Sequence, residues 1–102
     1  MRAVRYSRTS LEQLDQLLAQ GERKFGIKVS RDKEALVDET VNYLVEFPRS
    51  RVADARTGLC FYPVSRTPFI LVYDYDDAEL RIHFVLHKRA DRRRIDPTDI
   101  AW

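Results

Sequence analysis

Three residues in the last quarter of the chain carry side chains suited to acid–base chemistry and phosphate binding. Arg81, His83 and His87 follow one another at spacings of two and four residues. Histidine titrates near neutral pH and can serve as a general acid or base, and a guanidinium group binds phosphate through parallel hydrogen bonds. The simpler interpretation is that both histidines are polar residues on the wet side of a sheet, because the sequence identifies no third group to orient them.

These residues belong to a predicted β-hairpin. Residues 69–75 and 80–86 are rich in β-branched and aromatic types, and four turn residues separate them. A continuous register places only apolar pairs on one face. We expect that face to lie under helices, and the face with Arg81, His83 and His87 to be open or thinly covered. The expected pairs are Tyr75 with Leu80, Tyr73 with Ile82, Leu71 with Phe84 and Phe69 with Leu86, and on the alternate face Asp74 with Arg81, Val72 with His83, Ile70 with Val85 and Pro68 near His87.

A first helix is predicted after a short strand over residues 3–6. Ser7 or Ser10 can serve as its N-cap, and large apolar residues follow at helical spacing. Gly21 falls within the apolar stripe, where it either lets a second helix approach closely or marks a frayed helix end. The apolar positions are Leu11, Leu14, Leu17, Leu18 and Phe25, and the polar face carries Glu12, Gln13, Gln16, Gln20 and Arg23.

A second helix is predicted after Gly26, from about Lys28 or Ser30 to Phe47. Pro48 stops it, because proline disfavours helix in the residue before it and has no N–H to donate. The wide apolar stripe suits a helix that touches both a neighbouring helix and a sheet. We expect the inward residues to be Val29, Leu36, Val37, Thr40, Val41, Tyr43, Leu44, Val45 and Phe47, and the outward ones Asp38, Asn42 and Glu46.

With a further strand at residues 59–62, the chain is predicted to be an α+β protein. Its order is a short N-terminal strand, a two-helix hairpin and a three-stranded antiparallel meander, with the helices on one face of the sheet. The length of 102 residues fits one domain over 1–102, in which 88–102 form a basic tail. In that tail Asp96-Pro97-Thr98-Asp99 predicts a short helical turn. Ile100 and Trp102 then either dock the tail onto the body or form an exposed anchor for a partner.

The composition narrows the class of protein. Hydrophobic residues make up 44% and charged residues 33%, which excludes a disordered or fibrous chain. Cys60 is the only cysteine, so neither a disulfide framework nor a thiol zinc site is possible, and we expect it to be a small buried strand residue. No signal peptide or membrane-spanning segment is evident, so we expect a reduced, cytoplasmic protein.

Several short motifs follow one another along the chain, and their order is informative. They are Ser7-Arg8 leading into Leu11 and Leu14, Glu46-Phe47-Pro48, Gly58-Leu59 followed by Tyr62-Pro63-Val64 and Arg66, the strand from Phe69 to Tyr73, and Val85-Leu86-His87-Lys88-Arg89 with Asp91. In this order the chain resembles the RelE/ParE superfamily of toxins from type II toxin–antitoxin systems, and it is nearer the ParE branch. One departure is Cys60, where the family often has arginine. Either this protein lacks the function of that arginine, or a neighbouring residue such as Arg56 or Arg66 supplies it.

The resemblance implies a growth-inhibiting toxin with a cognate antitoxin as its partner. ParE-type members poison DNA gyrase, whereas RelE-type members are endoribonucleases that cut mRNA on the ribosome. The small net charge of +2 and the Val-Leu-His-Lys-Arg ending favour the gyrase target. If the protein is instead an RNase, His83 or His87 would be the acid or base, and Arg81 with Arg66 would bind the phosphate. A non-toxic protein-binding module on the same fold is the third possibility.

The basic tail is the predicted partner-binding region. Under the resemblance it would contact the antitoxin or an acidic surface of the target, although such a run of charges is often only a solvated face. The resemblance implies no cofactor, no metal, no small-molecule substrate and no membrane contact. The predicted partner-binding residues are His87, Lys88, Arg89, Arg92, Arg93, Arg94 and Trp102.

Overall fold

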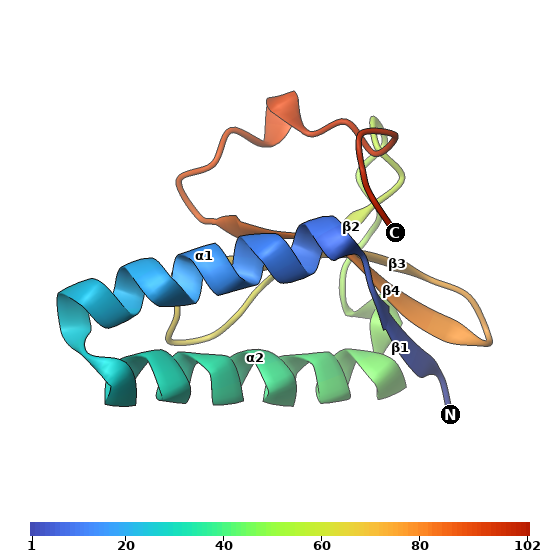
Figure 1. Cartoon of the computed structure of the whole chain (residues 1–102). Coiled ribbons are helices and arrows are strands. Elements are labelled where there is room, and N and C mark those ends of the chain that lie inside the picture. The colour runs from blue at the N-terminus through green and yellow to red at the C-terminus, as the bar shows by residue number, and fades with distance from the viewer.

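The computed structural model describes residues 1–102 and has the predicted order of elements, β-α-α-β-β-β (Figure 1). The α+β class is confirmed, with both helices packed on one face of the sheet. Neither helix has an apolar stretch that would cross a membrane. The elements are β1 (Ala3–Tyr6), α1 (Arg8–Phe25), α2 (Ile27–Glu46), β2 (Cys60–Pro63), β3 (Phe69–Tyr75) and β4 (Glu79–His87), with short 3₁₀ turns at Pro48–Ser50 and Arg92–Arg94.

The sheet is mixed, with strand order β1-β4-β3-β2. The meander β2-β3-β4 is antiparallel, as expected, whereas β1 runs parallel to β4, from Ala3 opposite Glu79 to Tyr6 opposite Ile82. A parallel pair needs a crossover, and the α1–α2 hairpin supplies it. The strand farthest from β1 is β2, which is therefore an edge strand.

Ser7 is the N-cap of α1 and is fully buried. Its Oγ accepts a hydrogen bond from the Ser10 N–H at 2.9 Å and donates one to the carbonyl of His83 at 2.7 Å. The next two N–H groups, of Arg8 and Thr9, donate to the carbonyl of Ala101 at 2.7 and 3.3 Å. The free donors at the start of a helix thus find partners in β4 and in the C-terminal tail.

The two helices meet at Gly26, whose φ of 91° reverses the chain direction at little steric cost. The second helix begins at Ile27, slightly earlier than predicted, and ends at Glu46 before Pro48. The predicted inward face of α2 is confirmed at Val37, Val41, Leu44 and Val45, which are buried. The sequence prediction was wrong at Val29, Tyr43 and Phe47, which are exposed; Tyr43 and Phe47 pack on each other, with ring centroids 5.1 Å apart.

The hairpin register changes at a β-bulge. The predicted pairs hold from Tyr75 and Leu80 to Tyr73 and Ile82, but Val72 then lies opposite Phe84. His83 is the extra residue, so every later predicted pair is displaced by one: Leu71 pairs with Val85, Ile70 with Leu86 and Phe69 with His87.

The neighbouring helix accounts for the bulge. β1 ends opposite Ile82, and beyond that point α1 supplies the hydrogen bonds that a strand would otherwise make. Ser7 Oγ donates to the carbonyl of His83, and the N–H of Val85 donates to Gln13 Oε1 at 2.9 Å. Gln13, predicted to face outward, instead satisfies the backbone of β4. A bulge lets β4 bend to meet these side chains.

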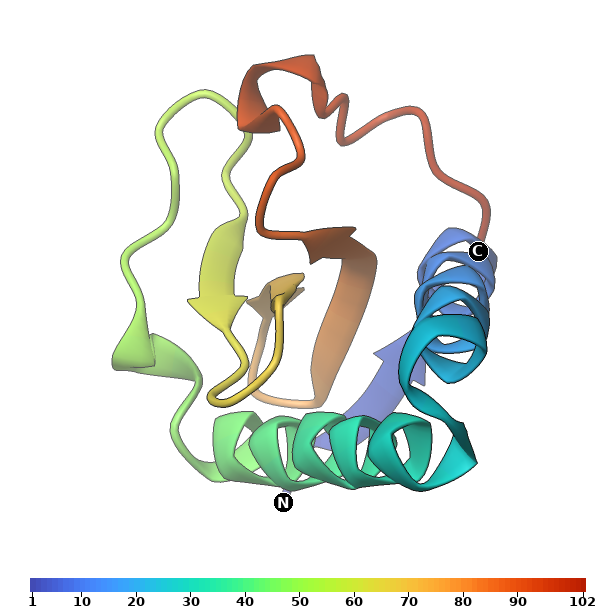
Figure 2. The ribbon, with the colours of Figure 1, turned by 90° about the vertical axis from the view of Figure 1, so that its left-hand side faces the viewer.

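The second face of the sheet is covered by the tail, so of the two expectations, an open or a thinly covered face, the open face is wrong. The tail arches over this face and returns to the start of α1, as Figure 2 shows. Ile95, 8% exposed, packs among Leu59, Ile70, Val72 and Phe84. Ile100 packs on the same cluster, so the docked interpretation of the tail is correct for this residue.

We predict that Ile95→Ala lowers the free energy of unfolding by about 2–3 kcal/mol, because it opens a cavity in this second core. Val52→Ala is the matched control, since Val52 is 93% exposed, and it should change the stability by less than about 0.5 kcal/mol. Urea unfolding followed by circular dichroism measures both. Equal stability of the two variants would mean that the tail does not pack on the sheet in solution.

Candidate functional site

One carboxylate joins Arg81 and His83 at the start of β4. Asp74 accepts a hydrogen bond from Arg81 Nε at 2.7 Å, and its Oδ1 lies 2.8 Å from His83 Nε2. Arg81 also donates through Nη1 to Asp76 at 2.8 Å and to Glu79 at 3.1 Å. Asp74 is the third group that the sequence did not assign to a histidine, although its pairing with Arg81 was predicted correctly.

These contacts shift the acid–base properties of the cluster. Hydrogen bonds to Asp74 and Asp76 raise the pKa of Arg81. Burial pushes the pKa of Asp74 upward, but the hydrogen bonds from Arg81 and His83 outweigh burial and leave that pKa lowered. The hydrogen bond from Arg81 lowers the pKa of exposed Asp76 to about 2. Arg81 is therefore engaged by carboxylates of its own hairpin at neutral pH.

His83 is enclosed, with 9% of its surface exposed. Trp102 packs edge-on against its imidazole, with the ring centroids 4.8 Å apart, and the guanidinium of Arg5 lies 4.8 Å from the Trp102 ring centroid. His83 Nδ1 is buried without a hydrogen-bond partner. A substrate could reach this histidine only by displacing Trp102.

The other two predicted RNase residues lie elsewhere. His87 is at the far end of β4, about 20 Å from Arg81 at ~3.3 Å per residue along the strand. Arg66 lies in the β2–β3 turn with a φ of 63° and lines a hollow beside α2. Of the four candidates, the structure brings together only Arg81 and His83.

The basic tail residues are divided between three places. Lys88 and Arg89 follow His87 at one end of β4, whereas Trp102 lies against His83. Arg92 and Arg93 line a pocket of about 370 Å³ with Arg51, Asp54, Arg56 and Phe61, which we call the arginine pocket. Arg94 is at the end of the same 3₁₀ turn, 3.8 Å from Asp91.

Within the arginine pocket, two arginines have well-defined structural contacts. The guanidinium of Arg92 lies 5.0 Å from the ring centroid of Phe61. Arg56 donates to the carbonyls of Ile95 and Arg92, at 2.8 and 2.7 Å. Of the two residues considered as substitutes for the family arginine, Arg56 thus holds the tail in place.

Cys60 itself points into the core. It is 3% exposed, its Sγ lies 3.6 Å from the carbonyl oxygen of Arg51, and burial raises the pKa of its thiol. The expectation of a small buried strand residue is confirmed. The chain also contains no group of three His, Cys, Asp or Glu side chains placed to hold a metal ion.

A second surface was missed by the sequence interpretation, because its residues were assigned to the core. Tyr43 is 45% and Phe47 is 53% exposed, and their ring centroids are 5.1 Å apart. Tyr62, on the edge strand β2, lies 6.1 Å from Tyr43. Tyr43 lines two hollows, of about 380 and 270 Å³, and we call them together the aromatic groove. Charged residues border it: Arg2, Arg49 and Arg66 line the hollows together with Glu39 and Glu46, and Arg51 lies over Tyr62.

The chain is similar to a known protein in its fold, but no match is found in its sequence. No protein-family model matches the chain, and no curated protein matches it in sequence. A solved chain described as "Chromosomal ParDE TA system from P. aeruginosa" matches in structure, with a TM-score of 0.74 and 17% sequence identity. The match covers 85% of this chain and 96% of that chain. The likeness is one of fold.

This fold likeness agrees with the order of elements described above. Nearly the whole of the matched chain, and most of this one, takes part in the likeness. At 17% identity it transfers no individual site residue. The roles of the arginine pocket and the aromatic groove must therefore be argued from their own chemistry.

We predict that Asp74→Asn lowers the free energy of unfolding by about 1 kcal/mol at pH 7, because Arg81 and His83 lose their shared carboxylate. The pKa of Asp74 is lowered in the folded state. Its contribution is therefore present above the unfolded pKa of about 4 and is lost as the pH falls through the folded pKa. Urea titrations between pH 7 and pH 2.5 should show the stabilities of the variant and the parent converging at the acidic end. Asp77→Asn, in the turn that follows β3, is the control. If the difference in unfolding free energy between Asp74→Asn and the parent stays constant with pH, the role assigned to the charge of Asp74 is wrong.

Proposed function

We propose that this protein is the toxin component of a type II toxin–antitoxin pair and acts in the manner of ParE-type toxins, on DNA gyrase. The observation that carries the proposal is the fold likeness to a chain of a ParDE system, 96% of which is covered. The sequence adds independent support, because the Val85 to Arg89 ending of β4 is the motif that resembles the ParE branch. Such a toxin is a binding protein and has no catalytic site.

The alternative of a RelE-type endoribonuclease has less support from the placement of the candidate residues. General acid–base cleavage of RNA needs an acid, a base and a phosphate-binding cation around one scissile bond. Here Arg81 is bound by carboxylates and His83 is covered by Trp102. His87 is about 20 Å from Arg81 along the strand. No pair of these groups converges on an open site.

The aromatic groove is the surface best suited to an antitoxin. Exposed aromatic rings beside arginines are enriched at protein interfaces and supply much of their binding energy. The groove also adjoins β2, which is the last strand of the sheet, and added strands pair with strands in this position. An antitoxin segment with apolar side chains and several carboxylates would complement both the rings and the surrounding arginines.

The first test is induction of this chain alone in a bacterial host. We expect growth arrest with loss of plasmid supercoiling and DNA breaks, while total mRNA stays intact. A gene with an early stop codon on the same plasmid is the control. Rapid mRNA cleavage with undamaged DNA would replace the gyrase target by RNA. Unimpaired growth at good expression would leave a non-toxic binding module, which is the function that buried Cys60, in place of the family arginine, would favour.

The second test examines the aromatic groove. We expect Phe47→Asp to weaken binding of the antitoxin encoded by the adjacent gene by tenfold or more, because it places a charge among the rings. Growth inhibition by Phe47→Asp alone should persist, whereas rescue by co-expressed antitoxin should fail. Val52→Asp, at a site that is 93% exposed, is the matched control and should still be rescued. Full rescue of both variants would place the antitoxin on another surface.

A further inference from the structure

A small cavity lies at the tip of the helical hairpin, far from the aromatic groove. Its volume is about 90 Å³, and α1, α2, the start of β3 and the end of β4 enclose it. Three of its lining residues carry a basic side chain and none carries a carboxylate. The lining residues that matter here are Gly21, Lys24, Phe25, Lys33, Phe69 and His87, which we call the lysine cavity.

Lys33 is held in a defined position within this cavity. Its Nζ lies 5.1 Å from the ring centroid of Phe25 and 6.0 Å from that of Phe69. It is also 3.7 Å from the point where a Cβ on Gly21 would stand, so the ammonium lies beside α1 at this glycine. A long side chain ordered over two rings has lost part of the conformational entropy that binding would otherwise cost.

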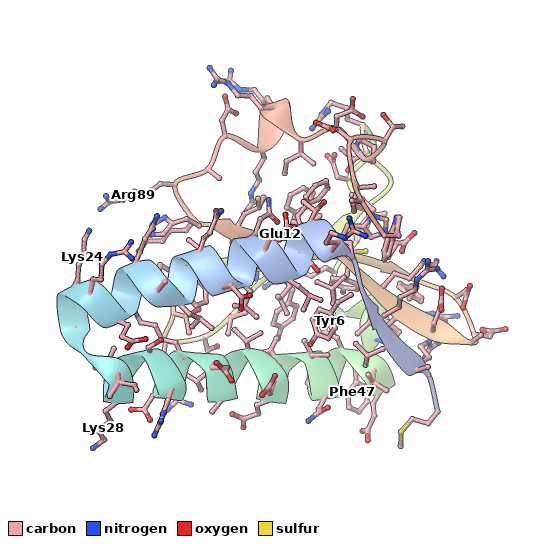
Figure 3. All side chains as sticks on the ribbon, in the orientation of Figure 1. Tyr6, Glu12, Lys24, Lys28, Phe47 and Arg89 are labelled. Carbon is pink, nitrogen blue, oxygen red and sulfur yellow. The ribbon has the colours of Figure 1, made fainter.

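The positive charges around Lys33 have no acidic partner. Lys24, Lys33, Lys88 and Arg89 take part in none of the ion pairs of this structure. Burial lowers the pKa of His87, and the four cations add to this shift, which indicates a positive potential at this end of the molecule. Figure 3 shows Lys24 and Arg89 at the same end of the molecule.

We propose that the lysine cavity binds a phosphate group of a nucleic-acid backbone, held by Lys24 and Lys33 with His87 at its wall. The volume suits a single oxyanion and is well below the ~300 Å³ at which pockets for larger ligands begin. Lysine ammonium groups bind phosphate as point charges from several directions. Two lysines from different helices, with Lys88 and Arg89 beside them, place several positive charges around a cavity of this size, and a phosphate carries more negative charge than a single carboxylate.

The test measures binding of inorganic phosphate and of a short DNA duplex to the full chain at low salt. Titration with phosphate should shift the His87 imidazole resonances in NMR spectra, while those of His83 stay constant. Lys33→Met and Lys24→Met should each weaken phosphate binding at least fivefold, since methionine keeps the apolar stem and removes the charge. Lys28→Met removes the same charge from α2 outside the cavity, and its binding should stay within twofold of the parent.

The outcomes separate the sources of the phosphate. Displacement of inorganic phosphate by the duplex, with the same dependence on Lys24 and Lys33, supports a backbone phosphate as the ligand. Binding of inorganic phosphate without competition by the duplex would overturn the nucleic-acid assignment. An equal effect of all three lysine variants, or unchanged His87 resonances, would overturn the site itself. Binding of an acidic peptide but not of phosphate would reassign the cavity to a protein partner.

Discussion

The buried hydroxyl of Ser7 lies where β1, α1 and β4 meet. Ser7 follows the last residue of β1. Its Oγ accepts a hydrogen bond from the Ser10 N–H in the first turn of α1, at 2.9 Å, and donates one to the His83 carbonyl at the bulge of β4, at 2.7 Å. A buried polar group in such a position must have its partners, since an unpaired one costs about 1–3 kcal/mol. The place where α1 leaves the sheet is therefore fixed, and with it the position of the helical hairpin above β3 and β4.

The bulge at His83 divides the protein into regions with different chemistry. Before the bulge, the second face of the sheet carries an ion-pair cluster centred on Arg81 and Asp74. After it, the same face is apolar and lies under the tail, which Arg56 and the start of α1 hold at two points. The unpaired charges are left at the far end, around Lys33 and His87. This division explains why Arg81, His83 and His87, which follow one another along a single strand, do not form one site.

Local sequence patterns sufficed to predict the fold. The features that they did not predict depend on contacts between residues far apart in the sequence. Helix and strand limits follow from Ser7, Gly26, Pro48 and alternation in the hairpin, which are all local signals. The bulge depends on side chains of α1 that lie about 70 residues away, such as Gln13, so hairpin pairing alone could not reveal it. Tyr43 and Phe47 have core-like spacing, and only the three-dimensional structure shows that they are exposed. The clustering of Lys24 and Lys33 with His87 likewise needs the closed hairpin.

The parallel pairing of β1 with β4 also dictates when the protein can fold. β1 is synthesised well before its only strand partner, which contains residues 79–82, so it cannot pair until β4 has been made. Until then the helical hairpin has no sheet to cover, and its apolar stripe stays exposed or is held by other proteins. Such non-local pairing is slow to form. A nascent chain that ends before residue 79 therefore has neither the complete sheet nor the lysine cavity, because both need residues of β4.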